Sequence, residues 1–433
     1  MPCAGIKVNS GDSFTIIPCQ FSSNYPENEL MEVDGKQLCH FHAPLEDNSG
    51  NLTEKGKWRQ DKNQKFYAEI SELREKLLNS VDDQVLDLSG VVFPGYANFR
   101  GQQFPEVDFF YAQFSGPYTN FREAKFKGNV NFEEARFSAR TDFRDAIFKM
   151  EAGFYHTKFR YAEFSGTKFI GEDADFRNAQ FKGKVDFNKS LFKKKAFFTS
   201  PGNDDDIDVF QGEVQFEGTI FLEEVDFANR KFQRSTNFKD CIFHKAPCFH
   251  GCSLHQDTKF TDADFRDTKS DEAVGAYQTL KLDMENKRAR QEQLRFYALE
   301  MKSRRHTEKR KLVKFLSWLY EVTSDYGQSI SLPLIWLGLS LAVFAIIYAI
   351  LFLAVPMLDH KKIDILVLTS RFSLEQMIRP FGSFDIQAMP EFHKKLSQAN
   401  LLSLRLIAAL QSFLSLILLL LSALATRWRF KIG

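Results

Sequence analysis

The 433-residue sequence lacks the short motifs that mark common enzyme active sites. It contains no nucleophile elbow, no glycine-rich phosphate-binding loop and no paired carboxylates spaced to hold catalytic metal ions. Its histidine and acidic residues are scattered through the middle region, as they are on solvated surfaces. We therefore predict that the protein is not an enzyme and has no catalytic residue.

Cysteine is scarce, and all six cysteines lie before residue 253. We recognise no signal peptide ahead of them, so we expect reduced thiols and no disulfide framework. Cys241, Cys248 and Cys252 are expected at ladder or corner positions of the repeat described next.

What the chain has in abundance is phenylalanine, which recurs every five or six residues from Ala97 to Phe265. A small residue stands two positions before most of these rings, as in Ala97-Asn98-Phe99. A helix would place apolar residues every three or four positions, and a half-buried strand every two. Fixed self-similarity with another period is typical of a solenoid.

Each repeat is interpreted as a short straight segment and a corner, with phenylalanine and the small residue pointing inward. About 21 residues per coil would give roughly eight coils. Spacings of five and six alternate, as in Phe121, Phe126 and Phe132, so some corners must hold an extra residue. The stretch from Thr199 to Asp206 interrupts the ladder between Phe198 and Phe216 and is predicted to be an exposed loop.

The segments Ala174-Asp175-Phe176-Arg177-Asn178 and Ala263-Asp264-Phe265-Arg266-Asp267 resemble the pentapeptide-repeat proteins. The consensus of that family is a small residue, Asp or Asn, a central Leu or Phe, and two polar positions. The resemblance implies a right-handed quadrilateral β-helix with four segments per coil. Some soluble members imitate duplex DNA, which needs a strongly negative rod. Residues 97–267 carry 25 Lys+Arg and 27 Asp+Glu, a net charge of −2, so no nucleic-acid function is expected.

Two apolar segments near the end of the chain, Pro333 to Val355 and Leu401 to Ala425, are long enough to span a bilayer. Basic residues precede the first, with only Glu308 opposing them between Lys302 and Lys314, and follow the second. The positive-inside rule then places both termini in the cytoplasm and residues 356–400 outside. The expected membrane anchors are Arg304, Arg305, Arg310, Lys311, Arg427, Arg429 and Lys431.

The N-terminal segment carries Cys3, Cys19 and the compact Cys39-His40-Phe41-His42. Thiolate and imidazole are preferred zinc ligands, and a loop-rich segment without its own core would gain stability from a metal. A structural zinc site would use Cys19, Cys39 and His42, with Cys3 or His40. The spacing lacks a paired Cys-x-x-Cys, so incidental buried thiols are the alternative.

Between repeat and membrane, Glu272 to about Thr323 has helical composition. One face is predicted to carry Tyr277, Leu280, Met284, Leu294, Tyr297 or Ala298, and Met301. Residues 295–305, Asp325-Tyr326-Gly327-Gln328-Ser329 and residues 426–432 resemble bacterial pentapeptide-repeat membrane proteins with a two-helix, channel-like C-terminal region. This resemblance implies an inner-membrane location. The helical segment would either pack on the last coil or transmit a signal to a pore.

The segment between the spans leads through a short apolar helix to Pro380, Phe381 and Gly382, a layout similar to that of tetrameric cation channels. The cation-filter sequence Thr-Val-Gly-Tyr-Gly is absent, so potassium selectivity is not expected. Arg405 and Gln411 lie inside the second span, where polar side chains usually face a cavity or a helix, although Arg405 is close enough to the boundary to snorkel. The alternative is an extracytoplasmic cap without conduction.

The sequence thus predicts a β-solenoid, an α-helical linker and two transmembrane helices. The expected domains are 1–90 (Cys/His segment and helix), 91–268 (β-helix), 269–328 (juxtamembrane collar) and 329–433 (transmembrane hairpin). One functional reading is a homo-oligomeric pore in the lipid bilayer, gated when the solenoid senses a cytoplasmic protein or ligand, in stress or antiviral defence. The other is a non-conducting, membrane-anchored protein-binding scaffold.

Overall fold

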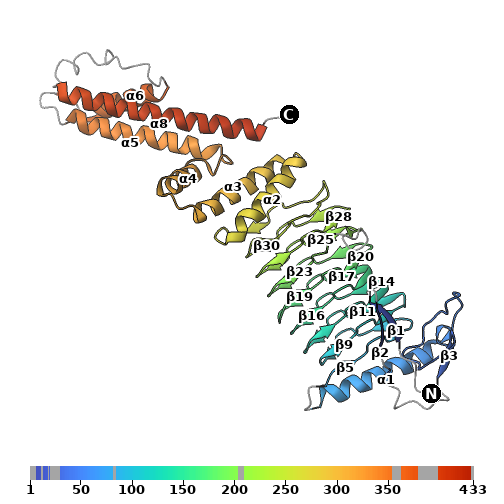
Figure 1. Cartoon of the computed structure of the whole chain (residues 1–433). Helices are drawn as coiled ribbons and strands as arrows, with labels where there is room; N and C mark the ends of the chain where they lie inside the picture. Colours follow the sequence, from blue (N-terminus) through green and yellow to red (C-terminus); the bar gives the residue numbers. More distant parts are fainter. Residues whose placement is uncertain are drawn as a thin grey trace. The chain divides into compact units, whose positions relative to one another are not determined.

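The computed structural model describes residues 6–10, 13–17, 19, 30–80, 84–202, 209–353, 362–378 and 398–430. The chain divides into two compact units, Met1–Thr279 and Leu280–Gly433. Figure 1 shows the first as a stack of short strands with a helix at its N-terminal end, and the second as a set of helices.

The first unit begins with small elements that lead into the solenoid. Two antiparallel hairpins, β1 (Ile6–Ser10) with β2 (Ser13–Ile17) and β3 (Met31–Val33) with β4 (Lys36–Leu38), precede a 3-10 turn (Lys55–Lys57) and helix α1 (Gln60–Leu78). On α1, Phe66 is buried with its ring 6.0 Å from Phe93 of the first coil. The Tyr67 hydroxyl donates to the carbonyl of Pro94 (2.8 Å). Helix α1 therefore covers the open end of the solenoid axis, which an uncapped repeat would expose to water.

The solenoid strands form three sheets of parallel ladders. The seven-stranded sheet holds β5 (Leu86–Asp87), β9 (Val107–Asp108), β13 (Val130–Asn131), β16 (Ala152–Gly153), β19 (Ala174–Asp175), β23 (Ala196–Phe197) and β27 (Val225–Asp226). The eight-stranded sheet holds β8 (Gln103–Phe104), β12 (Lys125–Phe126), β15 (Ile147–Phe148), β18 (Lys168–Phe169), β22 (Leu191–Phe192), β26 (Ile220–Phe221), β30 (Ile242–Phe243) and β31 (Asp264–Phe265). The twelve-stranded sheet covers two sides and holds β6 (Val92–Phe93), β7 (Ala97–Asn98), β10 (Gln113–Phe114), β11 (Tyr118–Asn120), β14 (Arg136–Asp142), β17 (Lys158–Glu163), β20 (Gln180–Phe181), β21 (Val185–Asp186), β24 (Val209–Phe210), β25 (Val214–Gln215), β28 (Lys231–Phe232) and β29 (Thr236–Asn237).

Four columns of stacked phenylalanine rings fill the solenoid axis, one column for each side of the coil. Neighbouring rings within a column lie between 4.4 Å (Phe93 to Phe114) and 5.3 Å (Phe159 to Phe181) apart. The four columns begin at Phe93, Phe99, Phe104 and Phe109 and run through about eight coils. The predicted inward ladder and the solenoid are therefore confirmed.

Two kinds of corner explain the alternation of five and six residues. Corners that follow the columns of Phe99 and Phe109 place a residue at positive φ two positions after the ring, as at Glu123 (φ 61°) and Asn178 (φ 58°). These left-handed corners advance by five residues, so the extra residue lies at the other two corners of the coil. The residue before the ring supports the left-handed corner: Asp108 Oδ1, for example, accepts the N–H of Phe110 (2.8 Å).

The break in the ladder is shorter than the sequence analysis predicted. Val209–Phe210 is strand β24, and the Phe210 ring stacks on Phe181 (5.0 Å) and Phe232 (4.9 Å). The ladder thus resumes at Phe210 and not at Phe216. Of the predicted loop, residues 203–206 lie outside the described part.

Helix α2 (Asp271–Asn286) begins in the first unit and ends in the second. The second unit continues with α3 (Arg290–Thr307), α4 (Lys311–Ser324), α5 (Ser331–Leu353), α6 (Lys362–Ile378) and α8 (Gln398–Phe430). On α2, Tyr277, Leu280 and Met284 are buried as predicted. On α3, Ala298 is the buried one of the two predicted alternatives, Leu294 and Met301 are half-buried, and the fully buried Phe296 was not predicted.

Candidate functional site

The N-terminal cysteine and histidine side chains gather where β4 ends against the first coil. Cys19, Cys39 and His42 are buried, and their ligand atoms all lie within 4.8 Å of one another. His40 does not join them, because its Nε2 lies 3.0 Å from Glu69 Oε2 on α1. Cys3, the fourth residue nominated from the sequence, lies outside the described residues.

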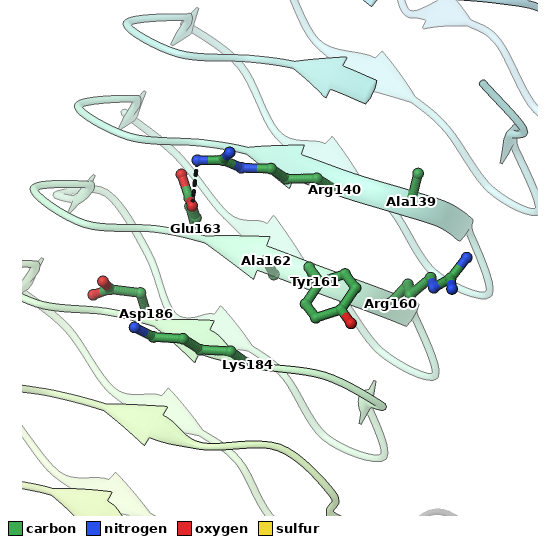
Figure 2. Close-up of a pocket in the computed structure, with 8 residues that line it drawn as sticks. All are labelled: Ala139, Arg140, Arg160, Tyr161, Ala162, Glu163, Lys184 and Asp186. Atoms are coloured by element: carbon green, nitrogen blue, oxygen red, sulfur yellow. Dashed lines mark hydrogen bonds and ion pairs between the residues drawn. The ribbon is translucent and has the colours of Figure 1, made fainter. Parts of the chain in front are cut away.

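A ridge on the solenoid was not foreseen from the sequence. Strands β14 and β17 run through a position where other coils turn, so they are seven and six residues long while most solenoid strands have two. They carry Arg140, Arg160 and the half-exposed Tyr161 outward on neighbouring coils (Figure 2). The sequence does not reveal the missing corner, because Phe137 to Phe143 spans six residues and Phe159 to Phe164 spans five, both ordinary spacings of the ladder.

Two hollows flank Tyr161 on this ridge. The first, about 510 Å³, is lined by Ala139, Arg140, Arg160, Tyr161, Ala162, Glu163, Lys184 and Asp186; the second, about 530 Å³, lies beside Ser138, Lys182 and Gly183. In Figure 2, Arg140 pairs with Glu163 (2.6 Å) at one end of the hollow. Burial raises the pKa of the Asp186 carboxyl on its floor. The hollow combines an aromatic ring with charges of both signs, as protein-binding surfaces do.

The basic cluster before the first apolar helix is less uniformly positive in three dimensions than in sequence. Arg304 pairs with the buried Glu300 (2.6 Å), Lys302 lies 3.3 Å from Asp325, and Arg305 contacts Glu321. Lys309, Lys311 and Lys314 are exposed, while Arg310 between them lies 3.5 Å from Glu308. Exposed positive charge therefore concentrates at the start of α4.

Helix α4 presents large apolar side chains to the surface of its unit. Leu312, Phe315, Leu316, Trp318 and Leu319 are between 39% and 69% exposed. Exposed lysines at its first turn accompany them. This combination of apolar face, tryptophan and basic residues is typical of a helix that lies in a membrane interface.

In the described part of the chain, two helices are long and apolar enough to cross a membrane, Ser331–Leu351 within α5 and Leu402–Arg427 within α8. Their bounds lie within four residues of those predicted. On α8, Arg405 and Arg427 are exposed. The side chain of Arg429 and the whole of Lys431 lie outside the described part, as do Pro380, Phe381 and Gly382.

Gln411 lies inside a bundle of α5, α6 and α8 from one chain and is fully buried. Its Oε1 accepts the Tyr348 hydroxyl of α5 (2.8 Å), and its Nε2 donates to the carbonyl (3.0 Å) and hydroxyl (2.7 Å) of Ser373 on α6. Phe344, Phe372 and Ala408 pack around this network. The sequence left two possibilities for Gln411, a cavity or another helix, and in the structure it contacts the helices α5 and α6. A role for Gln411 in a pore stays a prediction.

Helix α6 runs back along α5 to the middle of the apolar spans. Helix α6 begins at Lys362, soon after α5 ends at Leu353. The Phe372 ring of α6 lies 4.9 Å from the Tyr348 ring of α5. One residue later, the Ser373 hydroxyl donates to the carbonyl of Leu341, near the centre of α5 (3.0 Å). Farther along α6, Gln376 accepts the hydroxyl of Ser412 on α8 (3.2 Å). The last turn of α6 is therefore level with the central part of both apolar helices.

Comparison with known proteins identifies the repeat. Residues 88–147 and 109–158 match the family model of pentapeptide repeats, which describes nine copies. Neither the curated proteins nor the solved structures yield a match. Stacked phenylalanine rings continue beyond the matched stretch, as far as Phe265 in one column. Residues 88–158 are therefore pentapeptide repeats, and the chain forms a parallel β-solenoid of about eight coils followed by helices, of which two in the described part are long and apolar.

Proposed function

We propose that several copies of this chain assemble in a membrane as a pore, with the pentapeptide-repeat solenoid as its cytoplasmic sensor. The observation that carries this proposal is the depth of α6. The chain leaves α6 at Ile378 level with the middle of the apolar spans and enters α8 only at Gln398. A chain that continues from this depth needs its backbone polar groups satisfied by protein or by a water-filled cavity.

Assembly is part of the proposal because one three-helix bundle has a packed interior. The network of Tyr348, Ser373 and Gln411 closes the space between α5, α6 and α8. A conducting path would run between bundles, around a symmetry axis. Exposed apolar residues on α5 and α8 leave area for contacts with lipid or with further copies.

Reconstitution of the purified full-length protein in a planar bilayer tests conduction directly. Gly382→Val and replacement of residues 379–397 by a Gly/Ser linker of equal length should reduce the current without changing membrane insertion. Met150→Ala is a control, because that side chain is exposed on the solenoid and lies outside the apolar helices. Wild-type protein that stays silent under voltage, or a linker variant with full current, would contradict the pore.

The second candidate is a non-conducting scaffold that holds a protein partner at the membrane. The two hollows beside Tyr161 favour it, since tyrosine and arginine dominate binding energy at protein interfaces. Tyr161→Ala should abolish partner capture in either reading, with Met150→Ala as a control at another exposed position. Stress or antiviral defence is a physiological setting proposed from the family resemblance alone.

A further inference from the structure

We propose that Cys19, Cys39 and His42 bind a zinc ion that fastens the N-terminal segment to the solenoid. The two sulfur atoms of Cys19 and Cys39 are 3.5 Å apart, and Cys39 Sγ lies 3.2 Å from His42 Nδ1. The three residues are 7%, 1% and 2% exposed, respectively. Three soft or borderline ligands thus converge on one point that water does not reach freely.

The spacing of the three ligand atoms fits three corners of a tetrahedral zinc site, whose fourth corner a water molecule would occupy. Zinc bonds of ~2.3 Å to sulfur and ~2.0–2.1 Å to nitrogen place two sulfurs about 3.8 Å apart, and sulfur and nitrogen about 3.6 Å apart. The two separations that involve Cys39 are shorter than these values by a few tenths of an ångström, and all three ligand atoms lie within 4.8 Å of one another. Small side-chain rotations would therefore admit the ion without rebuilding the backbone.

A hydrogen bond at Nε2 of the His42 ring leaves Nδ1 able to bind a metal ion. His42 Nε2 lies 3.2 Å from the carbonyl oxygen of Ser89. A carbonyl only accepts hydrogen bonds, so Nε2 carries the proton and Nδ1 keeps a lone pair directed toward the two thiols. A backbone carbonyl that fixes the imidazole in this way is the usual outer partner of a zinc-bound histidine.

The cluster also joins parts of the chain that have little core of their own. Cys19 follows β2, Cys39 and His42 belong to a turn after β4, and Ser89 lies in the first coil. In the same turn, the carbonyl of Phe41 accepts the N–H of Val92 in β6 (2.9 Å). A solenoid needs a firm cap at its end, and a metal ion supplies folding free energy to a segment that is too small to bury much apolar surface.

Metal analysis of the full-length protein, purified reduced, without chelators and without a histidine tag, tests the proposal. We expect about one zinc per chain. Replacement by Co²⁺ should give the visible absorption of a tetrahedral site with a thiolate charge-transfer band. Cys39→Ser and His42→Ala should each lose the zinc, because each removes one of the three protein ligands. Cys252→Ser, which alters a thiol inside the solenoid, should leave the zinc content unchanged.

Three results would overturn the zinc site. The first is wild-type protein that contains no zinc and takes up neither Zn²⁺ nor Co²⁺ on titration. The second is zinc content that survives in both Cys39→Ser and His42→Ala. The third is a disulfide between Cys19 and Cys39 in protein kept under reducing conditions. Because the cobalt spectrum is recorded on the wild type, the test does not depend on the variants folding.

Discussion

Three residues after a ladder phenylalanine, threonine or cysteine can replace alanine and donate a hydrogen bond to the preceding coil. The hydroxyl of Thr157 donates to the carbonyl of Phe132 in the preceding coil (2.7 Å), and Thr167 does the same to Phe143 (2.7 Å). Cys241 and Cys252 occupy equivalent places, with Sγ 2.8 Å from the carbonyls of Phe216 and Phe227. The ladder position predicted for these two cysteines is confirmed, and the hydrogen bond explains why a buried thiol is accommodated there.

The solenoid cysteines should resist alkylation in the folded protein. Burial raises the pKa of Cys241 far above its ordinary value, that of Cys252 to about 12 and that of Cys248 to about 11. Only the thiolate reacts, so at pH 8 the reactive fraction is very small. Mass spectrometry after iodoacetamide treatment should find these thiols unmodified until denaturant is added. Rapid modification of Cys241 in the native protein would contradict its interior position.

A single phenylalanine of the ladder should carry measurable stability. Phe159 is 1% exposed and stacks between Phe137 (4.9 Å) and Phe181 (5.3 Å), whereas Arg160 beside it is exposed. Phe159→Ala should cost ~3–5 kcal/mol of unfolding free energy because it leaves a cavity in the axis. Arg160→Ala should change it by less than about 0.5 kcal/mol. Denaturation followed by the β-sheet circular dichroism signal checks both, and equal effects would show a wrong register.

At the scale of the element, the corners that are not left-handed depend on close approach between coils. A Cβ on Gly171 would lie 2.1 Å from the carbonyl oxygen of Lys149 in the preceding coil, and one on Gly128 would lie 2.7 Å from the backbone of Glu106. Glycine is required here by contact with the neighbouring backbone, whereas the left-handed corners accept Asp, Asn, Glu and Lys.

Gly171→Ala should therefore destabilise the solenoid by ~1–3 kcal/mol, as overpacked sites do. Gly275→Ala is a suitable control, since this glycine lies in helix α2 with nothing within 4 Å of the added Cβ. It should stabilise the protein by roughly 0.5–1 kcal/mol through helix propensity. Thermal melting of both variants compares them, and a neutral Gly171→Ala would mean that neighbouring coils are looser than described.

In the bundle of α5, α6 and α8, we expect the hydrogen bonds of Gln411 to hold α6 in place. Gln411→Leu removes the acceptor of Tyr348 and the donor to Ser373, and hydrogen bonds of this kind between membrane helices contribute ~0.6–2 kcal/mol. Membrane insertion should be unchanged or improved, because a polar group leaves the span. Limited proteolysis in detergent should become faster at α6 and remain unchanged for Leu410→Ala. Undiminished protection of α6 would show that the network does not hold this helix.

At the scale of the whole molecule, the main prediction concerns the orientation of the chain in the membrane. We predict that both termini are cytoplasmic and that residues 356–400 are extracytoplasmic, except that α6 enters the membrane from that side. Cysteine introduced at Ser397 should react with an impermeant thiol reagent in spheroplasts. Cysteine introduced at Met150, which is 43% exposed on the solenoid, should react only after lysis. Native Cys241 is not a suitable reporter, because its buried thiol would stay unlabelled whichever side of the membrane the solenoid lies on. The reverse labelling pattern of the two introduced cysteines would overturn the orientation.

Sequence alone was enough for the features that depend on local composition and period. Phenylalanine at five- and six-residue spacing, preceded by a small residue, leaves few alternatives to a solenoid, because only a chain that turns at every repeat brings those rings to one axis. The apolar spans were equally readable, since crossing a bilayer requires length and composition rather than a particular partner.

Tertiary structure decided whatever depends on which coil or helix lies next to which residue. The sequence could nominate Cys3, Cys19, Cys39, His40 and His42, but only packing separated His40, drawn to Glu69, from the three that converge. The ladder phenylalanines that flank the long parts of β14 and β17 have the same spacing as those that flank an ordinary corner. Only the three-dimensional structure therefore showed that Tyr161 lies on the outer surface. Gln411 was recognisable as costly in a span, yet its partners lie 38 and 63 residues away in sequence. Contacts over such distances arise from chain folding as a whole, and no local period encodes them.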